Sequence, residues 1–228
     1  MKNMRILIVN SLYPPNVIGG AEISTQKLAE ELAKRGEEVF VLTTGDKDDV
    51  SEQKGVTIYR RRFCNIMSFW EFKHSTFGKR LVWKFIDYLN PCNAKAISEI
   101  LKMVRPDVVH TNTIYGIAPY IWKCAEKQNI PIVQTLRDYN LMCPKSNMMK
   151  RGAHSCKKTR VACRIFRAGY RSLSKTVDAV TAPSEYTLSL FTNDGYFPKA
   201  RKIVVYNAID FDEQSFRRIA VQKVSGHK

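Results

Sequence analysis

The chain has 228 residues, 44% of them hydrophobic and 25% charged, which are ordinary values for one large globular domain with its own core. Lysine and arginine number 37 against 21 acidic residues, so the net charge of +16 favours anionic partners such as phosphates, nucleic acid or acidic lipid headgroups. No apolar run approaches the roughly 18 residues of a membrane-spanning helix, and the first residues lack the layout of a signal peptide. We therefore expect a cytoplasmic protein with reduced cysteines.

Short apolar runs rich in β-branched residues alternate with helical patterns along most of the chain. In the first half we expect, in order, a strand at Arg5–Asn10, a helix at Glu22–Arg35, strands at Glu38–Thr43 and Val56–Phe63, and a helix at Lys79–Val104 broken at Asn90-Pro91. In the second half we expect a strand at Asp107–Thr111, a helix at Gly116–Asn129, a strand at Pro131–Thr135, a helix from about Arg160, a strand at Asp178–Ala182, a helix from Ser184 and a strand at Lys202–Tyr206.

This alternation predicts the α/β class, with a Rossmann-like parallel sheet and helices on both of its faces. Such sheets bind ligands at the carboxyl ends of their strands, near the point where the strand order reverses. Candidate site residues are therefore sought directly after the apolar strands.

Gly19 and Gly20 stand just before the first expected helix. Because neither residue has a Cβ, they can bring bare backbone close to a ligand, and the helix N-terminus beyond them suits a phosphate. The competing interpretation is a tight turn in which the glycines adopt positive φ. A dinucleotide-binding fingerprint is excluded, because the six residues after the first strand contain no glycine and the second strand ends in Thr43-Thr44 instead of an acid.

Six stretches resemble the N-terminal half of the family 4 glycosyltransferases, which are retaining enzymes of the GT-B fold. They are RILIVNSLYPPNVIGGAE, KLAEELAKRGEEVFVLTT, RPDVVHTN, PIVQTLRDYNLMCPK, TAPSEYT and IVVYNAID, and the resemblance spans about residues 4–210. It implies two Rossmann-like domains facing each other across a cleft, the first holding the acceptor and the second the nucleotide-sugar. It also implies a UDP- or GDP-linked sugar as donor substrate, with no permanently bound cofactor and no metal.

The same resemblance implies that Gly19 and Gly20 lie against the donor diphosphate, with Glu22 beside them. Family members commonly carry a His-Asp pair after the fifth strand, where this chain has Arg137-Asp138. An arginine binds phosphate or carboxylate but cannot shuttle a proton, so Arg137 is expected to orient or neutralise a ligand. The alternative is an Arg137–Asp138 ion pair that braces the loop.

Five further residues are expected to face the same cleft. Three belong to the ends of the fourth and fifth strands and two to the start of a later helix, where a serine also suits an N-cap. They are His110, Asn112, Tyr139, Ser184 and Glu185.

The segment from Asn207 to Asp210 resembles the point at which the first domain passes to the second, and only 18 residues follow it. We therefore expect a glycosyltransferase domain at 1–206, a linker and tail at 207–228, and no donor domain. The chain is interpreted as the acceptor-side domain of a retaining glycosyltransferase that acts on a glycan or lipid-linked acceptor, incomplete or inactive alone, with a separate donor-domain subunit as partner. The alternative is a non-catalytic acceptor-binding subunit of a membrane-associated glycosylation complex.

Ten lysines or arginines and no acid lie between Tyr139 and Val177. Within this stretch, helical spacing would place on one face Arg160, Arg164, Arg167, Arg171 and Lys175. Such a face is either solvated or rests on an anionic membrane, and Phe69 and Trp70 could add an apolar lip for a lipid-linked acceptor. Peripheral contact with the inner membrane face is thus a further expectation. Nucleic acid is not expected, because no RNA- or DNA-binding module is recognisable.

Cys143, Cys156 and Cys163, together with His154, could be interpreted as a metal site. Their spacings lack the Cys-x2-Cys pairs typical of structural zinc. We favour reduced thiols, and a zinc or redox role stays open.

Overall fold

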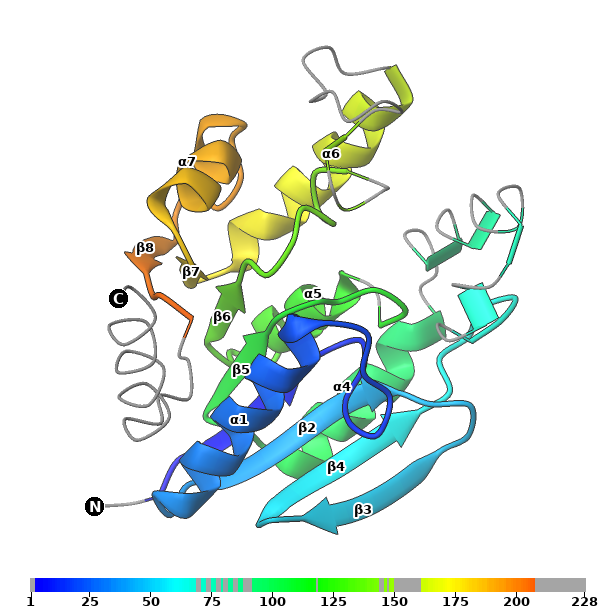
Figure 1. Cartoon of the computed structure of the whole chain (residues 1–228), viewed down its shortest axis with the longest axis vertical. Coiled ribbons are helices and arrows are strands. Elements are labelled where there is room, and N and C mark those ends of the chain that lie inside the picture. The colour runs from blue at the N-terminus through cyan, green and yellow to red at the C-terminus, as the bar shows by residue number, and fades with distance from the viewer. Residues whose placement is uncertain are drawn as a thin grey trace, which may run out of the picture.

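The computed structural model describes residues 3–68, 71–72, 75–76, 79, 82–83, 86–87, 92–117, 119–143, 146, 148–149 and 161–207. Its strands are β1 Arg5–Val9, β2 Glu38–Thr44, β3 Asp49–Gln53, β4 Val56–Arg61, β5 Val108–Thr111, β6 Ile132–Thr135, β7 Ala179–Ala182 and β8 Arg201–Val204. Its helices are α1 Gly20–Lys34, α4 Cys92–Val104, α5 Tyr120–Glu126, α6 Val161–Leu173, the short 3-10 helix η1 Ser174–Thr176 and α7 Glu185–Asn193. Figure 1 shows their arrangement.

The eight strands form one sheet in the order β3-β4-β2-β1-β5-β6-β7-β8. All neighbouring pairs are parallel except β3 and β4, which are antiparallel. The chain first builds outward from β1 through β2 and β4, and then continues on the other side of β1 with β5 to β8. The switch point therefore lies between β1 and β5, and the predicted Rossmann-like sheet is confirmed.

The edge strand β3 was not predicted from the sequence. Its residues, DVSEQ, carry no alternating apolar pattern, and four of the five are exposed. β3 is held in place by its pairing with β4, in which Asp49 lies opposite Arg60 and Gln53 opposite Val56. This pairing cannot be recognised from the pattern of the β3 residues themselves.

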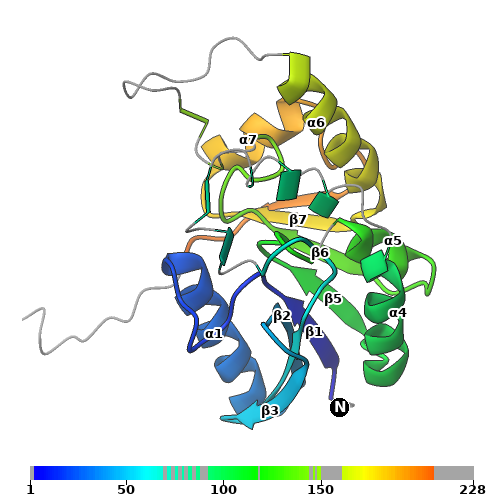
Figure 2. The same ribbon diagram turned by 90° about the vertical axis from the view of Figure 1, so that its right-hand side faces the viewer.

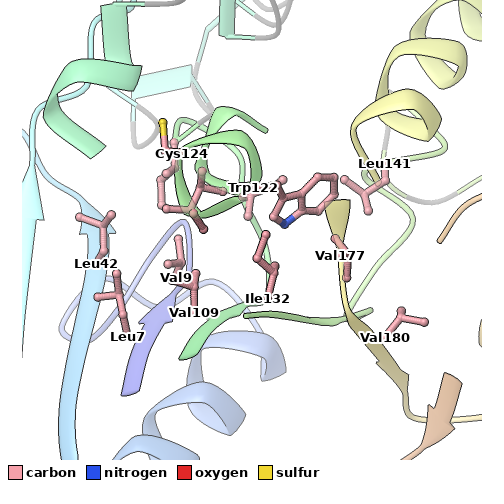
Figure 3. Close-up of a cluster of buried hydrophobic side chains, with 14 of the residues drawn as sticks. Leu7, Val9, Leu42, Val109, Trp122, Cys124, Ile132, Leu141, Val177 and Val180 are labelled. Atoms are coloured by element: carbon pink, nitrogen blue, oxygen red, sulfur yellow. The ribbon is translucent and has the colours of Figure 1, made fainter. Parts of the chain in front are cut away.

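Both faces of the sheet are covered by helices (Figure 2). On one face, Ile6 and Ile8 of β1 belong to a buried cluster with Ala29 of α1. On the other face, Leu7 and Val9 belong to the larger cluster that includes α4 and α5 (Figure 3). Because successive strand residues point to opposite faces, a central strand needs the continuous apolar run that RILIV provides.

Several predicted boundaries shift in the structure. The first helix begins at Gly20, two residues earlier than expected, and the predicted helix at Lys79–Val104 is confirmed at Cys92–Val104. Much of the earlier part of this predicted helix, 79–91, lies outside the described residues. Residues 208–228 also lie outside them, so the predicted linker and tail stay predictions. Over the part of the chain that the structure describes, no helix has the length and apolar character to cross a bilayer.

Candidate functional site

The loops after β1 and β5 are joined directly at the switch point. The backbone N–H of Ser11 donates to the Thr113 carbonyl at 2.7 Å, and the Thr113 N–H donates to Asn10 Oδ1 at 3.0 Å. Asn10 and Ser11 are fully buried. Sequence reasoning missed both, although two polar residues directly after an apolar strand were the available signal. Their hydrogen bonds hold the loops after β1 and β5 together at the carboxyl ends of these strands.

Gly19 and Gly20 form an exposed corner at the start of α1. Gly19 is the N-cap residue with extended backbone (φ −163°), and neither glycine has positive φ, so the tight-turn interpretation is wrong. A Cβ built on Gly20 would meet nothing within 4 Å, and one on Gly19 would meet only Glu22 Oε2 at 3.9 Å. The corner is therefore open space beside a helix N-terminus.

Glu22 caps its own helix. Its Oε2 accepts a hydrogen bond from the Gly19 N–H at 2.8 Å, and Glu22 as a whole is only 8% exposed. This is the glutamate half of a capping box, which satisfies one of the free N–H groups at a helix start. The carboxylate thus faces the backbone of α1, which accounts for its place in the sequence without a ligand.

Arg137 lies at the carboxyl end of β6 and connects three segments of the chain. Its Nε donates to Asn112 Oδ1 at 3.1 Å, after β5, and its Nη1 donates to Asn207 Oδ1 at 2.8 Å, after β8. No ion pair among the described residues joins Arg137 to Asp138, so the bracing-pair alternative is wrong. The Arg137 side chain is half-buried, and burial lowers its pKa from the ordinary value.

Asp138 and Tyr139 belong to a different environment. Asp138 Oδ1 accepts from the Asn140 N–H at 2.8 Å. The pKa of Tyr115 is raised mainly by burial, and the Asp138 charge adds to the effect. The Tyr139 ring stacks on Phe191 of α7, with centroids 6.3 Å apart and planes 12° apart. These two residues therefore order the loop after β6, while Arg137 alone of the three reaches toward the switch point.

His110 begins a chain of polar side chains that crosses three strands. His110 Nε2 lies 2.7 Å from Thr135 Oγ1, and Thr135 Oγ1 lies 2.7 Å from Thr181 Oγ1. Burial, helped by the charge of Arg137, lowers the pKa of His110 to about 4. The imidazole is thus neutral at neutral pH, which makes it a hydrogen-bonding group and not a cation.

Asn112 carries an unpartnered polar atom in the interior. The residue is 2% exposed, and its Nδ2 has no hydrogen-bond partner among the described residues. The orientation of the amide follows from its neighbour, since Arg137 can only donate and so must face the oxygen. A free N–H donor is therefore left beside the guanidinium.

Ser184 is the N-cap of α7, as the sequence predicted. Its Oγ accepts from the Thr187 N–H at 3.2 Å. Glu185 follows on the exposed first turn of the helix.

A small pocket opens at the same edge of the sheet, after β2 and β4. Its cavity volume is about 20 Å³, which is room for roughly one water molecule, and among its lining residues are Thr44, Gly45, Phe63, Asn65, Trp83 and Gly116. A wider hollow lies at the opposite, amino-terminal edge, beside Arg105 and Asn129. We assign the site to the first of the two edges, because parallel sheets bind ligands at the carboxyl ends of their strands.

The predicted basic face of α6 divides into two environments. Arg167 is 9% exposed, donates to the Met142 carbonyl at 2.9 Å and lies 3.4 Å from Asp194, so its assignment to a membrane-facing surface is wrong. Arg171 likewise turns toward the body of the domain and donates to the Asp194 carbonyl. Helical spacing alone could not reveal this, because the loop after β6 and the end of α7 close over that side. Arg164 is exposed as expected.

Other predicted residues fall outside the description. Phe69, Trp70, Arg160, His154 and Cys156 lie among the residues that the structure does not describe. Cys143 is buried and Cys163 half-buried, both as free thiols. The thiol interpretation and the membrane lip accordingly stay predictions.

A family model for Glycosyltransferase Family 4 matches residues 18–213. The chain belongs to glycosyltransferase family 4. A relative is an uncharacterized 42.6 kDa protein of the cps region of Klebsiella pneumoniae, 33% identical over 211 residues, which are 90% of this chain and 56% of that protein. The alpha-monoglucosyldiacylglycerol synthase of Streptococcus pneumoniae is 29% identical over 212 residues, which are 91% of this chain and 41% of that enzyme.

Solved structures support the same fold. The α,α-trehalose-phosphate synthase of Burkholderia xenovorans matches 96% of this chain with 53% of its own, at a TM-score of 0.53 and 11% sequence identity. The chain thus belongs to the family and has the Rossmann-like architecture that its sequence predicted. The chain spans about half the length of the Klebsiella pneumoniae relative and a smaller part of the Streptococcus pneumoniae synthase.

Proposed function

We propose that this chain is the acceptor-side domain of a retaining glycosyltransferase. It would transfer a sugar from a UDP- or GDP-linked donor to a glycan or lipid-linked acceptor. The observation that carries the proposal is the open glycine corner at the start of α1, in the connection after the central strand β1. Among the described residues, only Glu22 Oε2 comes within 4 Å of where a Cβ would stand on either glycine.

In this mechanism the domain stabilises charge. The departing nucleoside diphosphate becomes more negative as the glycosidic bond breaks, and the α1 N-terminus offers oriented N–H groups to it. Arg137 adds a fixed positive charge at the same edge of the sheet, and it takes no part in proton transfer. The acceptor would approach the same edge of the sheet, over the surface beside Phe63 and Asn65.

Donor binding is assigned to a second domain. Since the family 4 relatives are about twice as long as the match, that domain would be supplied by a longer protein or by a separate subunit. The name of the streptococcal relative includes diacylglycerol, which makes a lipid acceptor a reasonable first choice for assays.

The test is reconstitution of sugar transfer. The chain is assayed with nucleotide-sugars alone and then with a donor-domain polypeptide, and turnover is expected only in the second case. Gly20→Leu should reduce that turnover at least tenfold because its side chain would fill the corner, whereas Lys34→Leu at the exposed, opposite end of α1 should not. Full activity of Gly20→Leu would refute the role of the corner. Acceptor binding without turnover in any combination would favour the non-catalytic subunit instead.

A second proposal concerns membrane contact through α6. Two large apolar side chains, Val161 and Ile165, are 69% and 68% exposed on the same side of the helix as Arg164. An apolar pair beside a cation is the pattern of a helix lying in an anionic interface. Val161→Asp with Ile165→Asp should abolish co-sedimentation with vesicles containing anionic lipid, and unchanged co-sedimentation would exclude this surface.

A further inference from the structure

Arg137 is a half-buried cation for which the described residues provide no counter-ion. Its two hydrogen bonds go to the neutral side-chain oxygens of Asn112 and Asn207, and among the described residues no carboxylate lies within ion-pair distance of it. Arg167, which is more deeply buried, has Asp194 at 3.4 Å. An arginine stays charged at neutral pH, so its partial desolvation is unfavourable unless an anion compensates it.

A second unsatisfied group lies next to this cation. The Nδ2 of Asn112 is buried without a hydrogen-bond partner, while the Oδ1 of the same amide accepts from Arg137. Buried amide N–H groups are nearly always paired, so an unpaired one needs an explanation, such as a place for an ion or a ligand group. A cation and a free N–H donor on adjacent side chains are suited to bind an anion that carries several oxygen acceptors.

We propose that Arg137 and Asn112 form a binding subsite for an oxyanion, namely a carboxylate or a phosphate group. The Nη2 of Arg137, which donates to none of the described residues, and the Nδ2 of Asn112 are the donors that the oxyanion would use. The neighbouring Asp138 forms no ion pair with Arg137 among the described residues, and its Oδ1 accepts from the Asn140 N–H.

The oxyanion has two chemical sources in a glycosyltransferase. It can be the carboxylate of an acidic sugar, or it can be a phosphate carried by the donor or acceptor. This assignment to a sugar substrate rests on the proposed function, whereas the oxyanion subsite itself does not.

The experiment measures binding to the purified chain with four probes: glucuronate, methyl glucoside, inorganic phosphate and UDP. Binding is followed by the Nε–Hε NMR signal of Arg137 and by thermal unfolding. We expect glucuronate or phosphate, but not methyl glucoside, to shift the signal and raise the Tm. Preference for glucuronate identifies a sugar carboxylate, and preference for phosphate and UDP identifies a phosphate.

Two variants and a control make the test specific. Arg137→Gln should weaken oxyanion binding at least tenfold without lowering the Tm of the free protein, because it removes an uncompensated charge. Asn112→Asp places a carboxylate beside the guanidinium, so it should raise the Tm and abolish oxyanion binding while the arginine is retained. Arg201→Gln, which removes an exposed arginine at the amino-terminal end of β8, should bind as the wild type does.

Equal oxyanion binding by wild type, Arg137→Gln and Asn112→Asp would overturn the inference, as would a lower Tm for Asn112→Asp. Failure of the proposed function is distinguishable from this outcome. A chain that binds glucuronate or phosphate through Arg137 but supports no transfer leaves the subsite standing. Undiminished transfer by Arg137→Gln of both an acidic and an uncharged sugar would remove the subsite, and the positive charge of Arg137, from the reaction, while the assignment of sugar transfer to this fold would stand.

Discussion

Asn207 accepts a 2.8 Å hydrogen bond from the guanidinium of Arg137, which lies 70 positions earlier in the chain. Asn207 is also the first residue of the predicted linker. The chain therefore leaves the last strand of the sheet in contact with the candidate site. A residue expected to be only a connection contributes an oxygen to the surroundings of Arg137.

The two glycine positions Gly20 and Gly45 should respond differently to the same substitution. Gly20→Ala enters open space at a helix start, so the free energy of unfolding should stay within about 0.5 kcal/mol of wild type or rise. Gly45→Ala would bring its Cβ to 2.9 Å from the Lys47 carbonyl oxygen and 3.0 Å from Arg60 Cβ, and should destabilise by about 1–3 kcal/mol. Denaturant unfolding of both variants measures the contrast, and equal losses would show that Gly20 is packed after all.

Glu22 is predicted to contribute to stability through its cap. Glu22→Ala should lower the free energy of unfolding by about 1 kcal/mol, because the Gly19 N–H loses its acceptor. Glu22→Gln keeps an oxygen acceptor and should lose less. The control is Glu31→Ala, whose ion pairs with Lys34 and Arg35 are exposed and should contribute less than about 0.5 kcal/mol. If Glu22→Ala is as stable as wild type, the carboxylate has another role.

His110 should make the protein sensitive to mild acid. Its pKa falls from 6.5 in the unfolded chain to about 4 in the fold, mainly through burial and further through Arg137. Between these values the unfolded state binds a proton that the folded state does not, so stability is complete above pH 6.5 and declines as the pH approaches 4. The shift corresponds to about 3 kcal/mol.

The corresponding measurement is the free energy of unfolding between pH 7 and 4 for wild type and His110→Gln. The glutamine variant lacks the titrating group, so its stability should fall less across this range. Arg137→Gln should also reduce the acid sensitivity, because it removes the second cause of the pKa shift. Parallel curves for wild type and His110→Gln would contradict the assignment.

Arg167 and Arg164 are predicted to differ although they share a helix. Arg167→Met removes a donor to the Met142 carbonyl and leaves Asp194 without its cation, and should destabilise by about 3 kcal/mol. Arg164→Met lies on the exposed side and should change stability by less than about 0.5 kcal/mol. Thermal or denaturant unfolding checks both, and similar effects would mean that the two side chains share one environment.

The sequence by itself determined the fold class and showed which loops follow the strands of the sheet. The continuous apolar run of β1 required burial on both faces, and the alternation of strands and helices required a parallel sheet. The glycines before α1 and the serine before α7 were recognisable because capping and close backbone approach depend on neighbouring residues in sequence. These features are local, so a linear pattern contains them.

Only the tertiary structure decided which side chains meet. Asn112, Arg137 and Asn207 follow three different strands, and no spacing in the sequence indicates that they share hydrogen bonds. The burial of Arg167 was equally hidden, since it depends on a loop and a helix packed against α6. Periodicity reports the side of a helix on which a residue lies, but what covers that side is set by contacts between distant segments.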